Sequence, residues 1–278
     1  MDATTDRPAT TSDAYERQVW NGRAAAYADS YAAVCAYAAD ELLDAVGVGA
    51  GRTVLDVGTG PGTVAARAVE RGAVVGAVDA EPSMVELAAR RLPTVDVRHA
   101  ILPHLPYPDS SFDAVVANFV LNHVGRPRAA VAELGRVARP GGRIAVTVWP
   151  HPPSPMQRLW SEVLDAAGLT EPDDLLTVAA DENFERTVAG FAGLLRDGGL
   201  TEVDCRVLDW EFRVDPARWW QGPVYGFGAL GRTVSRLSPA EVAAVKVHYD
   251  RLVVDRLAPD GALVLPTSAL LAVGRRAP

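Results

Sequence analysis

The 278-residue sequence is poor in cysteine, in lysine and in positive charge generally. Its two cysteines, Cys35 and Cys205, lie far apart and have no further Cys or His at metal-ligand spacing, which argues against a disulfide framework or a zinc site. The formal net charge is −8 and Lys246 is the single lysine, so there is no basic excess to follow a phosphate backbone. These shortages predict a cytoplasmic protein that holds no metal and binds no nucleic acid.

Long apolar runs are also missing. No uninterrupted apolar stretch approaches the roughly 20 residues that span a bilayer, and the N-terminus lacks the basic and apolar segments of a secretory signal. We therefore expect no membrane association and no export. Hydrophobic residues still make up 49% of the chain, enough to fill the core of one large α/β domain or two small ones.

Three patterns divide the first half of the chain. Residues 1–12 are polar and aperiodic, which predicts a disordered tail. Residues 13–49 carry apolar side chains at helical spacing, which predicts two helices broken near Asp29-Ser30. Residues 50–150 alternate strands and helices with short turns, as parallel strands joined by crossover helices do. We expect the strands near 52–57, 74–79, 95–99, 112–118 and 143–149.

The second half continues the sheet and then departs from the alternation. Residues 151–214 predict substrate-side helices and a long strand, whose apolar phase changes near Leu208 and suggests a bulge there. The closing strand falls within residues 262–278. Between these two strands, residues 215–261 are far longer than a hairpin needs, and Ser238-Pro239-Ala240-Glu241 forms a helix-capping sequence. We therefore expect a helical lid inserted between strands six and seven.

A glycine-rich turn follows the first expected strand, in Val54-Leu55-Asp56-Val57-Gly58-Thr59-Gly60-Pro61-Gly62. Glycine allows unusual backbone dihedrals there and lets a ligand approach within contact distance. In an open parallel sheet such a turn lies at the carboxyl edge, where cofactors bind. Asp79 ends the second expected strand at the same edge, where a carboxylate can accept both hydroxyls of a ribose.

The spacing of the glycines separates two classes of cofactor. A nicotinamide dehydrogenase uses Gly-x-Gly-x-x-Gly, whereas here Gly62 comes one residue early. Asp56 stands two positions before the first glycine, and a carboxylate beside the turn suits a cationic ligand such as a sulfonium. The pattern therefore disfavours a dinucleotide.

Three further segments follow this turn in order: Val78-Asp79, Leu105-Pro106-Tyr107-Pro108-Asp109-Ser110-Ser111-Phe112-Asp113, and Arg139-Pro140-Gly141-Gly142-Arg143. With them, residues 50–150 resemble the class I S-adenosylmethionine-dependent methyltransferases, and within these the small-molecule group similar to the ubiquinone and menaquinone biosynthesis enzymes. The resemblance implies an α/β fold, a Rossmann-like doubly wound sheet of seven strands with the last antiparallel. It also implies S-adenosyl-L-methionine as cofactor and methyl transfer to oxygen, nitrogen or carbon of a small, largely apolar acceptor, which we expect to come from secondary metabolism.

The resemblance also implies which residues surround the cofactor. Gly58 and Gly60 would line its methionyl part, which Asn118 would face, while Asp79 would bind the ribose and Met84 would pack on the adenine. The full set of expected contacts is Tyr27, Asp56, Gly58, Thr59, Gly60, Asp79, Ala80, Met84, Ile101, Leu102 and Asn118.

Several of these positions have a second interpretation. Many relatives place an aspartate where Ile101 stands, so either a backbone carbonyl near Ile101 or Leu102 accepts the adenine amino group, or adenine recognition is looser. Tyr27 either lies over the methionine carboxylate or packs in the core, and Arg23 either assists it or is a solvated charge. Met84 is equally consistent with an ordinary core residue.

His123 is the candidate catalytic base. Transfer from a sulfonium is an in-line displacement that depends on holding the nucleophile about 3 to 3.5 Å from the methyl carbon. A base is needed only when the nucleophile is protonated and weakly acidic. His123 follows the fourth strand and acts either as that base or as a structural, orienting residue. His104 and His151, on loops at the same edge, are weaker candidates.

Aromatic residues in the expected lid suggest a pocket for the acceptor: Trp219, Trp220, Tyr225 and Phe227. Packing of the lid on the sheet would explain them equally well. Fold alone also leaves open a protein that keeps the cofactor without transferring its methyl group, as a pericyclic catalyst or a regulatory subunit. We expect a monomer or a homodimer.

Overall fold

The computed structural model describes residues 10–172 and 178–278, and its centre is a seven-stranded sheet in the order β3-β2-β1-β4-β5-β7-β6. Strands β1 to β5 are parallel, and β7 runs antiparallel to both its neighbours. The expected Rossmann-like doubly wound sheet with a final antiparallel strand is confirmed. The strands are β1 (Thr53–Val57), β2 (Val74–Asp79), β3 (Asp96–His99), β4 (Phe112–Asn118), β5 (Ala138–Val148), β6 (Leu200–Val214) and β7 (Leu263–Arg276).

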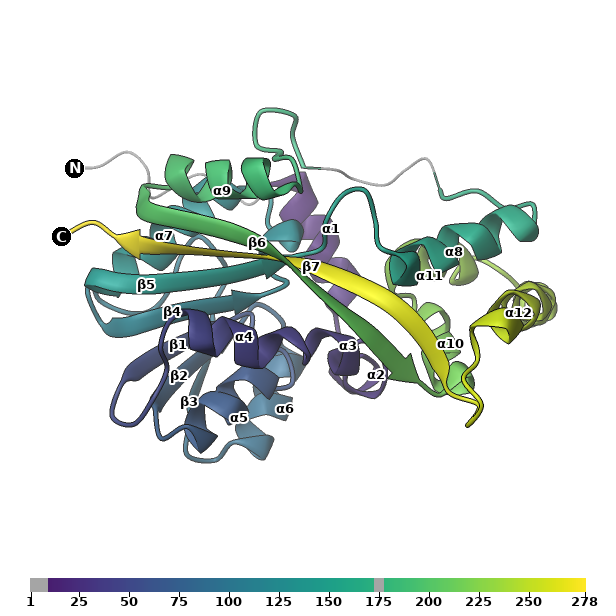
Figure 1. The fold of residues 1–278 in the computed structure, drawn as a ribbon, viewed down its shortest axis with the longest axis horizontal. Coiled ribbons are helices and arrows are strands. Elements are labelled where there is room, and N and C mark those ends of the chain that lie inside the picture. Colours follow the sequence, from purple (N-terminus) through teal and green to yellow (C-terminus); the bar gives the residue numbers. More distant parts are fainter. Residues whose placement is uncertain (1–9, 173–177) are drawn as a thin grey trace.

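Helices cover both faces of the sheet (Figure 1). One face is packed by α4 (Ala38–Ala45) and α5 (Thr63–Glu70), and the other by α7 (Pro127–Val137) and α9 (Val188–Asp197). Helix α6 (Pro82–Arg91) follows β2. The strand order reverses between β1 and β4, and in such sheets ligands bind at the carboxyl ends of the strands where this reversal occurs.

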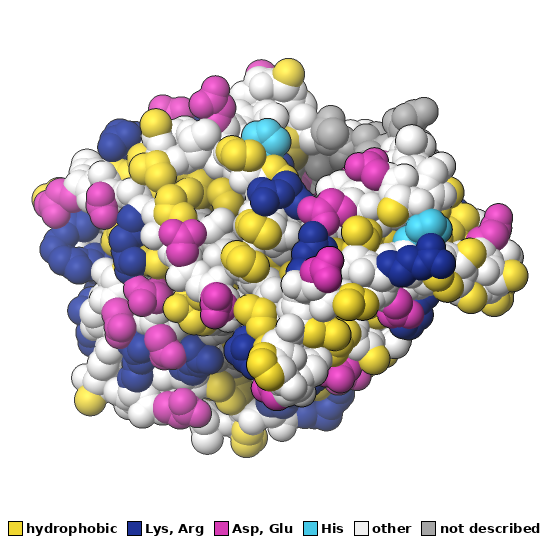
Figure 2. All heavy atoms as spheres, turned by 45° about the vertical axis from the view of Figure 1, so that its right-hand side comes forward, with side chains coloured by type: hydrophobic (Ala, Val, Ile, Leu, Met, Phe, Trp, Pro, Cys, Tyr) yellow, Lys and Arg dark blue, Asp and Glu magenta, His cyan; other side chains and the backbone are white. Residues whose placement is uncertain are grey.

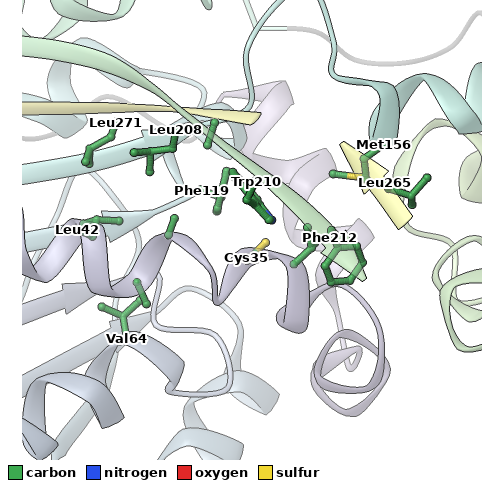
Figure 3. Close-up of a cluster of buried hydrophobic side chains, with 14 of the residues drawn as sticks. Cys35, Leu42, Val64, Phe119, Met156, Leu208, Trp210, Phe212, Leu265 and Leu271 are labelled. Carbon is green, nitrogen blue, oxygen red and sulfur yellow. The ribbon is translucent and has the colours of Figure 1, made fainter. Parts of the chain in front are cut away.

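The long strand β6 alternates regularly where a bulge was expected. Leu208 and Trp210 face the large core cluster with α4 and β7, as Figure 3 shows, whereas Val203 and Cys205 pack against the cluster on the opposite face. The two apolar phases are therefore the two faces of one strand, and the prediction of a bulge at Leu208 was wrong. The register shift lies instead between residues 201 and 204.

The N-terminal segment holds four short helices where two were expected. They are α1 (Thr11–Trp20), α2 (Ala24–Asp29), α3 (Ala32–Cys35) and α4. Helix α1 begins at Thr11, within the range 1–12 expected as a tail, because Thr10 and Asp13 form a reciprocal cap: the Thr10 hydroxyl accepts from the Asp13 amide at 3.0 Å, and the Asp13 carboxylate accepts from the Thr10 amide at 2.9 Å. Residues 1–9 of the expected tail lie outside the described residues. Gly22, with φ of 70°, separates α1 from α2.

The insertion between β6 and β7 is helical, as expected. It contains α10 (Pro216–Val224), α11 (Gly228–Val234), α12 (Pro239–Val253) and the 3₁₀ turn η2 (Val254–Arg256). Together with α8 (Pro155–Ala166) it gathers beyond the ends of β6 and β7 (Figure 1). Trp219 of α10 is fully buried there, with ring centroids 4.9 Å from Tyr31 and 5.4 Å from Trp160. The insertion is therefore fixed to α8 and to the N-terminal helices by aromatic packing.

The surface mixes charges of both signs. On the face drawn in Figure 2, arginine and acidic side chains are interspersed with apolar ones. Several arginines are paired, as in the contacts of Arg71 with Asp40 and Asp44 at 2.9 and 2.6 Å. In residues 10–172 and 178–278, no helix is long and apolar enough to cross a membrane.

Replacing Trp219 by alanine should lower the free energy of unfolding by about 3 to 5 kcal/mol, since a fully buried indole leaves a cavity that its neighbours cannot fill. Urea denaturation of the two proteins measures this. Val224→Ala is the matched control, because Val224 ends the same helix with 43% of its surface exposed, and its effect should stay within about 0.5 kcal/mol. Equal losses in the two variants would contradict the role of Trp219.

Candidate functional site

The glycine turn after β1 has the backbone that the sequence implied. Gly58, Gly60 and Gly62 have φ angles of 68°, 55° and 87°, in the left-handed region that side chains with a Cβ rarely adopt. A Cβ on Gly58 would also lie 2.4 Å from a side-chain carbon of Val120, and one on Gly60 would lie 3.6 Å from the Tyr27 ring. The turn thus brings bare backbone close to the side chains of Val120 and Tyr27.

The buried side chain of Asp56 holds this turn in place by hydrogen bonds. It is 1% exposed, and its Oδ2 accepts from the Thr59 hydroxyl at 2.7 Å and from the Ala65 amide at 3.0 Å. Burial raises the pKa of Asp56 to about 6; these two hydrogen bonds oppose the rise and the charge of Asp79 adds to it. Its Oδ1 is buried without a hydrogen-bond partner among the described residues.

Asp79 lies beside the turn at the end of β2. Its Oδ2 accepts from the Gly60 amide at 2.8 Å and its Oδ1 from the Glu81 amide at 2.9 Å. Burial is the main reason why the pKa of Asp79 lies above its ordinary value, and both amides work against that rise. Each oxygen keeps a further lone pair, so the fixed carboxylate can still accept hydroxyl donors from a ligand.

A cavity of about 590 Å³ opens at this carboxyl edge, within the size range of small-molecule sites. It brings together most of the residues that the resemblance implied for the cofactor: Tyr27, Gly58, Gly60, Asp79, Ala80, Met84, Ile101, Leu102 and Asn118. Asp56 and Thr59 do not line it. Both are buried under the turn, so their expected direct contact with the cofactor is replaced by a supporting role.

Two cavity residues, Asn118 and Ile101, already have hydrogen-bond partners within the protein. The Asn118 amide donates to the Cys35 carbonyl at 3.0 Å, and its Oδ1 accepts from the Thr147 hydroxyl at 2.7 Å. These bonds commit Asn118 to tying α3 to the sheet. The Ile101 carbonyl already accepts from the His104 amide at 2.9 Å, which leaves it one further lone pair for an adenine amino group.

The expected acceptor residues are only partly in place. Phe227 lines the cavity, whereas Trp219, Trp220 and Tyr225 do not. Trp219 and Trp220 are 0% and 3% exposed because the indoles of α10 pack the insertion onto its neighbours, Trp220 lying 5.1 Å from Tyr249. For these three residues the prediction of an acceptor wall was wrong, and packing was the better interpretation for both tryptophans.

Other aromatic residues line the cavity instead, and sequence analysis did not select them: Trp20, Tyr31, Phe119, Trp149 and Trp160. For two of these residues, their position in the sequence was an indication that they would line the cavity. Phe119 and Trp149 directly follow β4 and β5, the strands whose carboxyl ends form this edge, and their rings stack at 4.0 Å. Arg23, by contrast, lies outside the cavity lining, 5.9 Å from the centre of the Phe227 ring.

His123 lies in the 3₁₀ turn η1 (Leu121–His123) and lines the cavity, as does His151, whereas His104 does not. The His123 Nδ1 is 2.8 Å from Oε2 of Glu16, a residue of α1 that sequence analysis did not select. The same oxygen accepts from the Trp20 indole at 3.1 Å. Burial alone would raise the pKa of Glu16, but His123 and the Trp20 bond outweigh it, so this pKa lies below its ordinary value.

Known proteins share this fold and this motif. A family profile described as a methyltransferase domain matches residues 55–146. The demethylmenaquinone methyltransferase of Renibacterium salmoninarum is 38% identical over 124 residues, which are 44% of this chain and 52% of that protein. The demethylmenaquinone methyltransferase of Paenarthrobacter aurescens is 37% identical over 175 residues, 60% of this chain and 69% of that protein. The solved structure of the YcgJ protein from Bacillus subtilis has a TM-score of 0.56 at 18% identity, covering 87% of this chain and 99% of that one.

The chain belongs to the class I S-adenosylmethionine-dependent methyltransferases. The matched segment spans about half of the first relative and about two thirds of the second, at 52% and 69%. In this methyltransferase the site fits S-adenosyl-L-methionine on three observations. The glycine turn leaves bare backbone at the cavity, Asp79 keeps free lone pairs for ribose hydroxyls, and the buried Asp56 Oδ1 leaves negative charge uncompensated near a cationic ligand.

Asp79→Asn should weaken binding of S-adenosylmethionine by about 1.5 to 3 kcal/mol, because it removes a charged acceptor from the ribose end while keeping the size of the side chain. Titration calorimetry measures the dissociation constant. Glu86→Gln, on the exposed side of α6, is the matched control and should leave the constant unchanged. Unaltered binding by Asp79→Asn would remove Asp79 from the site.

Asp56 should make the stability of the ligand-free protein depend on pH. Its folded pKa of about 6 lies above the unfolded value of 3.8, so the folded state holds the proton longer. The stability that Asp56 contributes is complete below pH about 4 and is lost as the pH rises through about 6, at up to about 1.4 kcal/mol per pH unit. Relative to Asp56→Asn, the wild type should therefore lose free energy of unfolding over this window and level off above it. A difference that is constant with pH would refute the assignment.

Proposed function

We propose that this protein transfers the methyl group of S-adenosylmethionine to oxygen, nitrogen or carbon of a small, largely apolar acceptor. When bound, the cofactor supplies an electrophilic methyl group on a sulfonium sulfur. The residues of this chain would then hold the acceptor in line with that group and keep water away, and alignment of this kind supplies much of the acceleration in a displacement reaction.

The observation that carries the proposal is the aromatic wall of the cavity beside the glycine turn. The Trp20 ring lies 5.4 Å from Tyr27 and 5.3 Å from Phe227, and Tyr27 itself lies next to Gly60. Rings so close to the cofactor turn suit a flat, apolar molecule better than a sugar phosphate. An acceptor between them would lie at the methionyl end, where the transferred group is carried.

The insertion at residues 215–261 is proposed to act as a lid over this acceptor. Its Phe227, between α10 and α11, reaches the cavity, and the neighbouring Gly226 and Gly228 have φ angles of 84° and 70°. Such positions allow a segment to change its backbone direction, and a cover excludes water while the acceptor is aligned. Packing of Trp219 and Trp220 would keep the rest of the insertion in place.

The nature of the acceptor is part of the proposal. The net charge of −8 and the mixed surface of Figure 2 favour a small molecule over a nucleic acid. Cys35 and Cys205 are both free thiols, in keeping with action in a reducing cytoplasm. The apolar walls suit an acceptor from secondary metabolism, and His123 is the proposed base where that acceptor carries a proton.

Incubation with methyl-labelled S-adenosylmethionine and a panel of quinols, phenols and amines tests the function, and label should appear in at least one small acceptor. Phe227→Ala should raise the KM for that acceptor, while the dissociation constant of the cofactor changes by less than about 0.5 kcal/mol. Tyr225→Ala, two residues away and outside the cavity lining, is the control. Cofactor binding without transfer to the panel or to a cell extract would favour the non-transfer alternative, a pericyclic catalyst or regulatory subunit.

A further inference from the structure

We propose that Glu16 of the N-terminal helix is a positioning residue that presents His123 as a general base through Nε2, and that the acceptor therefore offers a hydroxyl oxygen. This inference rests on the proposed methyl transfer and narrows its acceptor class. His123 would touch the acceptor, whereas Glu16 would act only through His123.

The two residues come from distant parts of the chain. Glu16 lies in α1 and His123 in the turn after β4, and their Oε2 and Nδ1 atoms are 2.8 Å apart. The side chains are 24% and 35% exposed, so the pair is partly shielded while the imidazole still reaches the cavity. Both residues line the cavity, and the fold brings the Glu16 carboxylate against Nδ1 of His123.

The carboxylate determines which imidazole nitrogen carries the proton. An ionised carboxylate only accepts hydrogen bonds, so Nδ1 must donate to Glu16. The lowered pKa of Glu16 keeps it ionised at neutral pH. In the neutral imidazole the lone pair is then on Nε2, for which no hydrogen-bond partner exists within residues 10–172 and 178–278. A lone pair at the cavity wall is what a general base requires.

Trp20 fixes both members of the pair. Its indole Nε1 donates to Glu16 Oε2 at 3.1 Å, one helical turn along α1. Its ring meets the His123 ring edge to face, with centroids 5.3 Å apart and planes at 88°. The carboxylate and the imidazole are thus held by the same indole, which limits rotation of each.

Other charged groups surround the pair and would contribute to its pH dependence. Arg232 of α11 acts on Glu16 in the same direction as His123, favouring its charged form, and is itself paired with Glu171 at 2.9 Å. Asp13 accepts from the Gly125 amide at 2.7 Å, which is a second tie between α1 and this loop. The adjoining elements also carry Arg17 of α1, Arg126 and Arg128 at the start of α7, and Glu133 and Arg136 further along α7.

The presence of a base separates an amine acceptor from one that must lose a hydroxyl proton before it attacks. A neutral amine brings its own lone pair and needs no base, whereas a neutral hydroxyl is a weak nucleophile until its proton leaves. In the proposed step the hydroxyl proton moves to Nε2 of His123, and the oxygen electron pair forms the bond to the methyl carbon. The carbon–sulfur bond breaks, its electron pair stays on sulfur, and the products are a methyl ether, a neutral thioether and a protonated imidazole.

Nitrogen NMR of the full chain labelled at histidine tests the positioning directly. Of the five histidines, His123 is assigned by the signals lost in His123→Gln. Nδ1 should be the protonated nitrogen of neutral His123 in the wild type, and Glu16→Gln should abolish this preference. A wild-type His123 protonated at Nε2 would overturn the inference without bearing on methyl transfer.

Rates with phenol and 4-nitrophenol as acceptor probes test the chemistry. With phenol, which is protonated at neutral pH, kcat should fall by about 10²-fold or more in His123→Gln and about 10-fold in Glu16→Gln, with little change in KM. With 4-nitrophenol, assayed at a pH where it is ionised, both variants should lose less than about 3-fold. Asp13→Asn, which loosens the same helix, is the control and should slow both probes alike.

The outcomes separate this inference from the proposed function. Equal slowing of both phenols in Glu16→Gln would mean that the pair only docks α1, and would overturn the inference. Transfer to amines but to neither phenol would do the same while leaving methyl transfer intact. Cofactor binding with no transfer to any acceptor would overturn the proposed function itself.

Discussion

The site depends on the carboxylate of Asp56, a residue that does not itself line the cavity. Asp56 is buried at the end of β1, and its hydrogen bonds to Thr59 and to the Ala65 amide join the strand, the glycine turn and the start of α5. The turn can then keep its left-handed backbone and offer the Gly60 amide to Asp79. Without this support the turn would lose two of the hydrogen bonds that hold its backbone beside Asp79.

The glycine turn and Asp79, the proposed cofactor side of the cavity, could be placed from the sequence because their positions are set locally. Glycine at 58, 60 and 62 is required by backbone angles, and a residue that ends a parallel strand must lie at the carboxyl edge, so Asp79 was placed by its position alone. The sheet could be predicted from the regular alternation of strands and helices along the chain. The boundaries of the N-terminal helices were less predictable, because the cap between Thr10 and Asp13 depends on side-chain geometry as well as on composition.

The acceptor half could not be predicted in the same way because its residues meet only in the folded chain. Nothing near His123 in the sequence indicates Glu16, since the contact joins helix α1 to the turn after β4, 107 residues further along the chain. The aromatic residues of the insertion show that neighbours in the sequence can also separate in the fold. Trp219 and Phe227 are both aromatic residues of one insertion, yet one packs in the core and the other lines the cavity, and composition does not distinguish them.

Trp20 and Phe227 meet over the glycine turn with ring centroids 5.3 Å apart, although one precedes the first strand and the other follows the sixth. One wall of the cavity is therefore built from two segments that supply no strand, one before β1 and the other between β6 and β7. Exchange of either segment would alter the proposed acceptor pocket and leave the glycine turn and Asp79 as they are. On the proposed function, new acceptor preferences would arise from segments grafted at these two points, while the sheet that carries the glycine turn stays unchanged.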